Sequence, residues 1–260
     1  MTPRLFDLSG RVALITGAGS PTGIGFATAR LLGELGAAVA VTATTARAEE
    51  RAAELRASGC DAEGFAADLT DEEQVADLVR SVTARYGHID IVVNNAGMVS
   101  ITSPGESGGL AEMSFRTWRD GISRNLDTAF LVSRATVPSM AERGWGRIVS
   151  VTSVTGPLMA MRDEVVYASA KAGMVGLTRS IALDFSARGV TANAVAPGWI
   201  ATGSQTAHEA RQGEVTPVGR SATADEVAAA IAWLCTPGAA YVTGQCLVVD
   251  GGNSIAEERH

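Results

Sequence analysis

Seven short apolar runs recur along the 260-residue chain, and stretches with helical periodicity separate them. The runs do not alternate between apolar and polar residues, which is typical of strands buried on both faces of a parallel sheet. Helices that cross over between parallel strands in the right-handed sense produce a doubly wound α/β fold. We therefore predict a seven-stranded parallel sheet with helices on both faces and strands at 11–16, 38–43, 63–67, 89–93, 147–151, 190–195 and 245–249.

The chain is expected to form one domain over residues 1–260, with its core at about 10–252, because no linker-like segment or charge run divides it. We predict helices at 46–58, 71–86, 164–186 and 225–235. Capping boxes are expected at the second and the last of these starts, from Thr70 to Glu73 and from Thr223 to Glu226.

Composition excludes several classes of function. No run of 18 apolar residues occurs and the N-terminus does not resemble a signal peptide, so we expect a cytoplasmic protein without a membrane partner. The net charge of −7 argues against a nucleic-acid partner. Three scattered cysteines and three scattered histidines have no ligand spacing, so no structural metal is expected.

Residues 16–25, TGAGSPTGIG, lie between the first predicted strand and a helical pattern. Glycines after a buried strand allow backbone amides to approach a pyrophosphate, and the start of a helix favours an anion. Five residues separate Gly17 from Gly23, so the segment fits neither common dinucleotide fingerprint as written. An ordinary strand-to-helix turn is the alternative interpretation, and this segment alone does not decide between the two.

Further motifs occur in a characteristic order: Thr16-Gly17 with Gly23-x-Gly25, Asp68-Leu69, Asn94-Asn95-Ala96-Gly97, Asn125, Ser153, Tyr167-x-x-x-Lys171 and Pro197-Gly198. In order and spacing they resemble the short-chain dehydrogenase/reductase family, most closely the branch that includes β-ketoacyl-carrier-protein reductases. The resemblance implies a Rossmann fold, a homotetramer, and hydride transfer between a nicotinamide cofactor and a ketone or secondary alcohol, with 3-oxoacyl thioesters as one substrate class. One departure is the glycine loop, which Ser20-Pro21-Thr22 lengthens beyond the family's usual three residues between its first two glycines.

Four residues are the candidate catalytic groups. Tyr167 and Lys171 are i and i+4 on a predicted helix, and Lys171 is the single lysine among 21 basic residues. A cation about 4 Å from the phenol supplies roughly 4 kcal/mol at an effective dielectric near 20, enough to lower a tyrosine pKa by about three units. Tyr167 is then the general acid or base. Ser153, at a strand end, can orient the substrate oxygen, and the resemblance implies that Asn125 holds a water linked to Lys171. The alternatives are a surface tyrosine–lysine pair, a turn hydroxyl and an exposed helix asparagine.

The candidate cofactor-binding residues come from the glycine loop and from later strand ends. Besides Tyr167 and Lys171, which the resemblance places at the nicotinamide ribose, they are Gly17, Ser20, Thr22, Gly23, Ile24, Thr44, Arg47, Asp68, Leu69, Asn95, Ala96, Gly97, Pro197, Gly198, Ile200 and Thr202. The resemblance assigns Asp68-Leu69 to the adenine, Asn95-Ala96-Gly97 to the adenosine ribose, and Ile200 and Thr202 to the carboxamide. Several of these segments are equally compatible with ordinary strand-end turns.

The end of the second predicted strand favours NADP(H) over NAD(H). An NAD-selective site places a carboxylate there, whereas Ala43 occupies that position here. Thr44 and Thr45 offer hydroxyls, and Arg47 can pair with a 2′-phosphate. NAD(H) remains the alternative cofactor because Arg47 can equally be the solvated start of a helix.

The walls of the substrate site are predicted only in outline. Residues 98–114 are expected to rim the pocket, and residues 201–217 to form a short lid with Arg211 as its one fixed cation. Small residues at Ala168, Ala170, Ala172, Gly173 and Gly176 permit a subunit interface or a tight contact within the chain. Two other functions are weighed: an enoyl reductase, whose Tyr-x6-Lys pattern would need tyrosine where Glu164 stands, and a catalytically silent dinucleotide sensor or scaffold.

Overall fold

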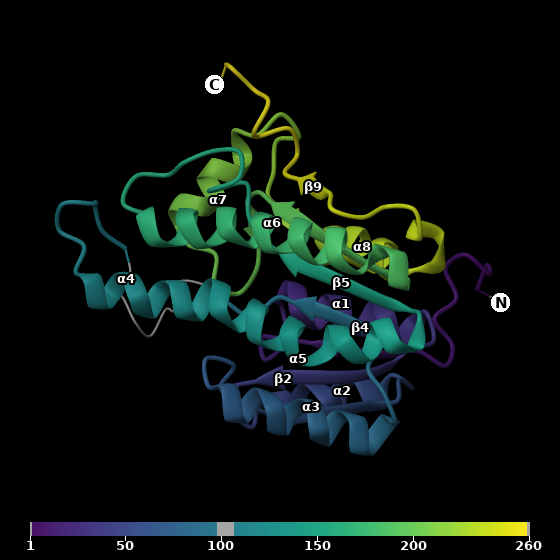
Figure 1. The fold of residues 1–260 in the computed structure, drawn as a ribbon. Helices are drawn as coiled ribbons and strands as arrows, with labels where there is room; N and C mark the ends of the chain where they lie inside the picture. The colour runs from purple at the N-terminus through teal and green to yellow at the C-terminus, as the bar shows by residue number, and fades with distance from the viewer. Residues whose placement is uncertain (1, 98–106, 259–260) are drawn as a thin grey trace.

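A computed structural model describes residues 2–97 and 107–258 of the chain. Its main sheet has seven parallel strands in the order β3-β2-β1-β4-β5-β6-β9 (Figure 1). All seven predicted strands are present in that sheet, as β1 (Val12–Ile15), β2 (Ala38–Ala43), β3 (Ala62–Ala66), β4 (Ile91–Asn94), β5 (Gly146–Val151), β6 (Val190–Pro197) and β9 (Cys246–Val249). The predicted doubly wound α/β fold is confirmed.

Helices connect the strands, and the four predicted helices are found within two residues of their expected bounds. The helices are α1 (Ile24–Glu34), α2 (Arg47–Ala57), α3 (Glu72–Tyr86), α4 (Phe115–Ile122), α5 (Thr128–Arg143), α6 (Val165–Phe185), α7 (Ala207–Glu214) and α8 (Ala224–Cys235). A π-helical turn, η1 (Ser123–Asp127), joins α4 to α5. Two-residue strands β7 (Ile200–Ala201) and β8 (Ala222–Thr223) pair beside the main sheet, and the sequence did not predict them.

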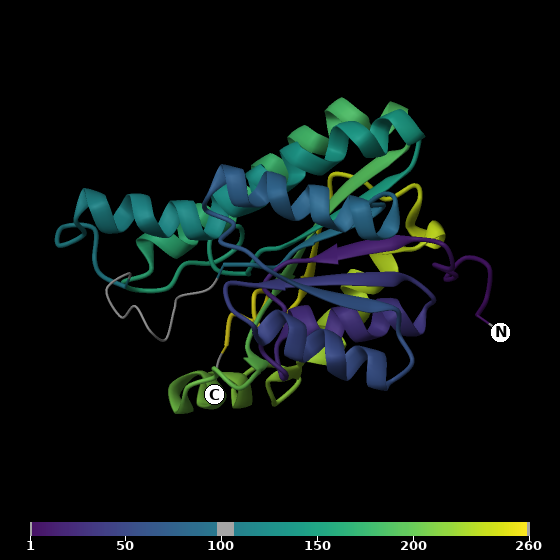
Figure 2. The ribbon, with the colours of Figure 1, turned by 90° about the horizontal axis from the view of Figure 1, so that it is seen from below.

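The apolar core lies in two layers because alternate residues of a strand face opposite sides of the sheet. Ala13 and Ile15 of β1 pack with residues of α1, α2 and α8, whereas Val12 and Leu14 pack with residues of α3, α5 and α6. Figure 2 shows these two groups of helices on opposite sides of the sheet. Burial on both faces explains why the strands read as unbroken apolar runs.

One of the two predicted capping boxes is correct. Thr223 begins α8 by accepting from Glu226 N, and the Glu226 carboxylate accepts from Thr223 N in return. At α3 the box does not form, because Asp71, one residue later than predicted, accepts from the amides of Glu73 and Gln74.

The strand order reverses direction between β1 and β4, which is the switch point where doubly wound sheets bind ligands. The glycine loop follows β1, Asn95 follows β4 and Ser153 follows β5. All of them therefore lie at the carboxyl edge of the sheet. Within the described ranges, no helix is both long enough and apolar enough to cross a membrane.

Candidate active site

Ser153 and Tyr167 are brought together from two different elements. Ser153 lies two residues beyond β5, and Tyr167 is in the first turn of α6. The Ser153 hydroxyl lies close enough to the Tyr167 phenol to act on its pKa as a hydrogen-bonding group. Ser153 Oγ accepts from the amide of Thr155 at 3.1 Å, so the turn-hydroxyl interpretation is correct and the substrate-orienting role stays a prediction. That backbone bond fixes the hydroxyl oxygen and leaves the hydroxyl proton free to point at Tyr167 or at a substrate oxygen.

Lys171 is fixed against the end of β5. Its Nζ donates to the carbonyl oxygen of Val151 at 2.9 Å, and its own carbonyl accepts from Thr152 Oγ1 at 2.7 Å. The ammonium lies 5.6 Å from the centroid of the Tyr167 ring. Tyr167 and Lys171 therefore lie on one face of α6, as predicted. The two hydrogen bonds of Lys171 join this part of α6 to the end of β5.

The pKa values differ from the sequence-based expectation. Burial raises the pKa of Tyr167 above its usual value, and the Ser153 hydrogen bond opposes that rise. Burial lowers the pKa of Lys171 to about 8. The predicted lowering of the tyrosine pKa by lysine is thus not present in the chain alone. The physical reason is that burial of Tyr167 disfavours the ionised phenolate, and the Lys171 ammonium, which is directed to the Val151 carbonyl, does not offset this.

Asn125 is buried rather than exposed, with 1% of its surface accessible. It lies in the π-helical turn η1, and its Nδ2 donates to the carbonyl of Gly121 at 3.2 Å. Its Oδ1 is buried and has no hydrogen-bond partner among the described residues. A buried acceptor without a partner fits the expected water position. Gly97 packs on this residue, since a Cβ at Gly97 would lie 3.0 Å from Asn125 Oδ1.

The glycine loop has the geometry of a phosphate cradle. Gly17 has a φ of +66° and lies so close to β4 that an added Cβ would be 2.7 Å from Ala96 Cα. Gly23 is the N-cap of α1 and Ile24 is its first residue, with no side-chain cap and no acidic residue in the first turn. The helix therefore presents uncapped amides, which is the arrangement that a dinucleotide pyrophosphate requires.

The segment after β4 is joined to the glycine loop by side-chain hydrogen bonds. Asn95 Nδ2 donates to the carbonyls of Thr16 and Gly17 at 2.9 and 3.0 Å, and Thr16 Oγ1 accepts from the amides of Asn95 and Ala96. The side-chain amide of Asn95 is thus used to shape the glycine loop. What remains for a ligand at this position is backbone and the small side chain of Ala96.

After β3, the two residues predicted at the adenine differ in exposure. The Asp68 carboxylate is exposed and accepts from the backbone and hydroxyl of Thr70 at 2.9 and 2.7 Å. Leu69 is 5% exposed and belongs to the core layer under α3 and α5. Both residues form a strand-end turn, and of the two only Asp68 has a side chain at the surface.

Two arginines lie beside the glycine loop at the end of β2. Arg47 Nε donates to Thr45 Oγ1 at 3.1 Å, and a Cβ added to Gly19 would be 3.5 Å from Arg47 Cβ. Arg51, one turn later, contacts the Gly19 carbonyl at 3.5 Å and is 12% exposed. Sequence reasoning missed Arg51, although its i+4 spacing from Arg47 places both on one face of α2. Thr44 is exposed beside them.

The segment after β6 crosses to the same edge. The carbonyl of Pro197 accepts from Val154 N, which joins this segment to the one that carries Ser153, and Gly198 packs on Asp250. Ile200 begins β7, and its carbonyl accepts from Thr202 N at 2.9 Å.

Of the residues that lengthen the glycine loop, Ser20 and Thr22 also make local bonds. The Ser20 carbonyl accepts from Gly23 N at 3.2 Å. The Thr22 hydroxyl accepts from Gly203 N at 2.8 Å, so this loop contacts the segment after β6 directly.

A cavity of about 190 Å³ lies beside Val154 and Thr155, the two residues that follow Ser153, and extends to the predicted lid. Apolar and polar side chains share its lining, which consists of Val154, Thr155, Met159, Ala160, Met161, Trp199, His208, Gln212 and Asn253. His208 and Gln212 come from α7, so the predicted lid does form one wall. Arg211 of the same helix is exposed and is not part of the lining.

Other predictions concern the rim and α6. Residues 98–106 of the predicted rim lie outside the described residues, and Gly108 forms an isolated bridge with Glu164. Two of the small residues of α6 serve contacts within the chain. Gly173 packs against Leu126, and a Cβ at Gly156 would overlap the carbonyl oxygen of Ala168. Metal sites were expected to be absent, and in the described ranges no group of three or more potential ligands is placed to hold one.

Comparisons with known proteins show which family the chain resembles along its length. A family model described as Enoyl-(Acyl carrier protein) reductase matches residues 17–254. The 3-oxoacyl-[acyl-carrier-protein] reductase FabG of Pseudomonas aeruginosa is 39% identical, with 95% of this chain and 98% of that protein covered. Cis-4-hydroxycyclohexanecarboxylate dehydrogenase of Sinomonas cyclohexanicum is also 39% identical, over 93% of this chain and 96% of that protein.

A solved structure is similar over the whole fold. It is a crystal structure of a putative NAD(P) dependent gluconate 5-dehydrogenase from Beutenbergia cavernae with bound NADP at low occupancy. It has a TM-score of 0.88 and 36% sequence identity, and the match covers 97% of this chain and 100% of that one. The sequence likeness and the fold likeness therefore extend over the same residues.

Proposed function

Because the chain belongs to the short-chain dehydrogenase/reductase family, we propose that it is an NADP(H)-preferring oxidoreductase that interconverts a ketone and a secondary alcohol. The observation that carries this proposal is the convergence of Ser153, Tyr167 and Lys171 at the carboxyl end of β5. These three side chains provide a hydrogen-bond donor, a proton donor and a cation around one point.

The residues of the chain divide the work of carbonyl reduction. A bound reduced nicotinamide dinucleotide supplies the hydride. Ser153 holds the substrate oxygen by a hydrogen bond, and Tyr167 transfers its phenolic proton to that oxygen as negative charge develops. Lys171 stabilises the phenolate that remains, and Asn125 Oδ1 offers an acceptor for a water on the path by which the proton is replaced.

The dinucleotide is proposed to lie along the carboxyl edge of the sheet. The amides at the start of α1 and the cradle at Gly17 suit its pyrophosphate, and the predicted residues after β3, β4 and β6 would line the rest. The preference for NADP(H) rests on Arg47 and Arg51 beside Gly19, with Ala43 where a carboxylate would stand. Within the described part of the chain, no carboxylate lies within ion-pair distance of Arg47, whereas Arg51 pairs with Glu54 at 2.5 Å. Arg47 is therefore the main candidate for a 2′-phosphate.

We propose 3-oxoacyl thioesters and small cyclic or hydroxylated ketones as the substrate classes. The cavity beside the Ser153 segment is the proposed place for the carbonyl end of such molecules, and its lining includes no lysine or arginine. The reductases of acyl carrier proteins and the cyclohexanecarboxylate dehydrogenase among the relatives both fit a site of this character.

Neither alternative function is supported as well. The matching family model bears an enoyl reductase name, but Glu164 stands where the Tyr-x6-Lys pattern needs a tyrosine, and it is the N-cap residue of α6. A silent dinucleotide sensor would not need the four catalytic side chains in their mutual arrangement.

The decisive experiment follows NADPH oxidation with purified protein across 3-oxoacyl thioesters, cyclic ketones and α-keto compounds. A panel of enoyl thioesters serves as the matched control, because it tests the competing reaction with the same cofactor. We expect turnover with at least one ketone class and none with enoyl thioesters. Turnover of enoyl thioesters alone, or of no compound while NADPH binds, would reject ketone reduction.

Assembly and location are also proposed rather than observed. We propose a homotetramer in which α5 and α6 contribute an interface, since Phe130, Ala172, Gly176 and Leu183 are all exposed on these two helices. Light scattering coupled to gel filtration measures the oligomeric state, and a monomer would reject the proposed tetramer.

We place the enzyme in the cytoplasm. Its three cysteines are free thiols, which suits that reducing compartment.

A further inference from the structure

Thr22 connects two segments that are 181 residues apart. Thr22 belongs to the residues that lengthen the glycine loop, and its Oγ1 accepts a hydrogen bond of 2.8 Å from the amide of Gly203. Gly203 lies between β7 and α7, in the segment that leads to the wall of the cavity beside Ser153. The bond therefore runs from the predicted cofactor loop to the predicted substrate lid.

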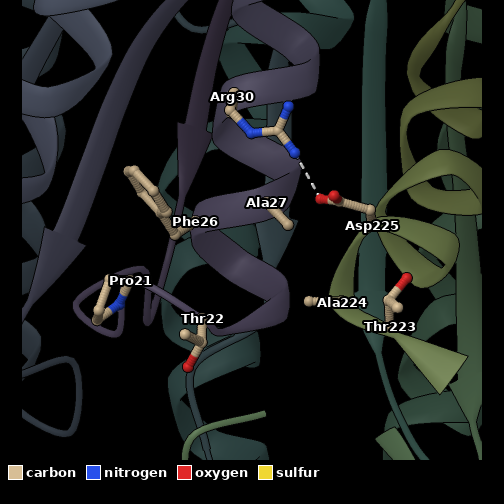
Figure 3. A pocket seen from close by; sticks show the side chains of 8 residues that line it. All are labelled: Pro21, Thr22, Phe26, Ala27, Arg30, Thr223, Ala224 and Asp225. Carbon is tan, nitrogen blue, oxygen red and sulfur yellow. Dashed lines mark hydrogen bonds and ion pairs between the residues drawn. The ribbon is translucent and has the colours of Figure 1, made fainter. Parts of the chain in front are cut away.

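The Thr22 end of this bond is attached to a rigid part of the fold. α1 begins two residues later and packs against α8, where Arg30 and Asp225 form an ion pair of 2.6 Å. Figure 3 shows that pair across a second cavity, of about 190 Å³, with the Thr22 oxygen directed away from it. The hydroxyl is thus not occupied by the α1–α8 contact and is available to Gly203.

The Gly203 end leads directly to the pocket wall. Thr202 and Ser204 share a hydroxyl hydrogen bond of 2.9 Å, and Gln205 bonds both to Thr202 and, at 2.8 Å, to Ser221 Oγ. Thr206 then caps α7 with a complete capping box. Local bonds therefore hold the residues on both sides of Gly203 and the start of the helix that carries His208 and Gln212 into the cavity.

The contact is also close in space. A Cβ added to Gly203 would lie 2.8 Å from Thr22 Oγ1, and apart from its chain neighbours no other described residue has an atom within 4 Å of that position. Among the described residues, Thr22 alone therefore restricts the size of residue 203. Glycine at position 203 leaves room for the Thr22 hydroxyl, and its backbone amide donates the hydrogen bond that this hydroxyl accepts.

We propose that Thr22 is a positioning residue that fastens the lid to the glycine loop and so couples cofactor binding to the assembly of the ketone pocket. It acts through Gly203 and α7 rather than on the reacting atoms. The proposal rests on the proposed function in taking the cavity beside Ser153 as the ketone site. Because Thr22 holds the segment that leads to α7, the α7 wall of the pocket is in place only when the glycine loop has its cofactor-binding conformation.

The first test compares T22V, which removes the acceptor, with T22S, which retains it. Hydrogen exchange at the Gly203 amide is the readout that needs no substrate, and we expect faster exchange in T22V with T22S at the parent rate. The KM for a ketone should rise about five-fold in T22V, the factor that corresponds to roughly 1 kcal/mol for one hydrogen bond, with kcat changed less. Unchanged exchange in T22V would overturn the proposal.

The second test is a double-mutant cycle on the close contact. G203A should raise the ketone KM in the parent but add nothing in a T22A background, because T22A removes the atom that the new Cβ would meet. If the effects of T22A and G203A on KM simply multiply in the double variant, the coupling is rejected.

A binding measurement distinguishes a tether from a phosphate ligand. NADPH binding is followed by nucleotide fluorescence without ketone. If T22V weakens this binding and G203A does not, Thr22 is a phosphate ligand and not a tether. A parent enzyme that reduces no ketone would reject the proposed function, while the exchange measurement would still decide on the tether.

Discussion

Lys171 Nζ donates its 2.9 Å hydrogen bond to the carbonyl of Val151, the last residue of β5. The bond fixes the ammonium at the strand end from which the Ser153 segment continues. Its distance to the Tyr167 ring centroid is 5.6 Å. The β5 carbonyl therefore holds the Lys171 ammonium at the same edge of the sheet as Ser153 and Tyr167.

The first prediction is that Y167F and K171R each lose most ketone turnover while the fold survives. Phenylalanine removes the transferable proton, and a planar guanidinium cannot place one point charge in the buried position of Nζ. We expect kcat to fall at least 100-fold in both variants, measured as NADPH oxidation with the best ketone of the panel. Thermal melts check the fold. Turnover within about tenfold of the parent, a barrier change under about 1.4 kcal/mol, would show that these roles are wrong.

The second prediction concerns pH and the stability cost of Lys171. Its pKa in the folded chain is lowered to about 8 by burial, below its ordinary value of 10.5. Below pH 8 both folded and unfolded chains carry the proton, and burial of the charge opposes folding by up to about 3 kcal/mol. Between pH 8 and 10.5 the folded chain releases the proton first, so the stability of the parent rises with pH.

The variant K171M has no such charge and should be more stable than the parent at pH 7, with its advantage shrinking as pH rises through 8 to 10.5. Denaturant unfolding at a series of pH values measures this difference. The matched control is R80A, an exposed cation of α3 that should show no comparable trend. A constant difference between K171M and the parent across this range would contradict the prediction.

The fold was predictable because the periodic signals are strong and local. These signals each involve residues that lie close together in the sequence. They are the seven apolar runs, the glycines at strand ends, and the capping box of Thr223 and Glu226. The error at Thr70 has the same origin, since Asp71 offers a carboxylate one residue later, and a carboxylate competes well for helix amides.

Parts of the site depend on contacts that a linear pattern does not encode. The π-helical turn that buries Asn125 has no distinct sequence mark, because it arises where α4 and α5 join beneath Gly97. The bond between Thr22 and Gly203 joins residues whose relation only the folded chain defines. Arg51 was recoverable, since its i+4 spacing from Arg47 is visible in the sequence.

The third prediction is an acid-sensitive start of α8. Arg220 holds the Glu226 carboxylate by two bonds of 2.8 and 2.7 Å, and together with the Thr223 amide it lowers the pKa of Glu226 to about 2. A lowered folded-state pKa stabilises the protein above the ordinary value near 4.5, and the contribution is lost as pH falls towards 2.

The variant E226Q should therefore melt at a lower temperature than the parent from pH 5 to 7, and the difference should narrow as pH falls below 4.5. Calorimetry across this range provides the measurement. E73Q is a suitable control, since Glu73 is an exposed carboxylate in the first turn of another helix, α3. Equal melting temperatures of E226Q and the parent at pH 7 would show that the carboxylate does not stabilise the helix.

The last prediction is that Arg47 determines the preference for NADPH over NADH. Arg47 lies beside Gly19 and is held by Thr45, and a charge-assisted pair with a 2′-phosphate is worth about 1.5–3 kcal/mol. R47A should therefore reduce kcat/KM for NADPH by about tenfold or more and leave kcat/KM for NADH within about twofold. R51A should have a smaller effect, because Arg51 is already paired with Glu54. R80A again controls for the general loss of positive charge, and added salt should weaken NADPH binding more in the parent than in R47A. A parent enzyme that prefers NADH, or an R47A variant that keeps the full preference for NADPH, would show that the 2′-phosphate is bound elsewhere or not at all.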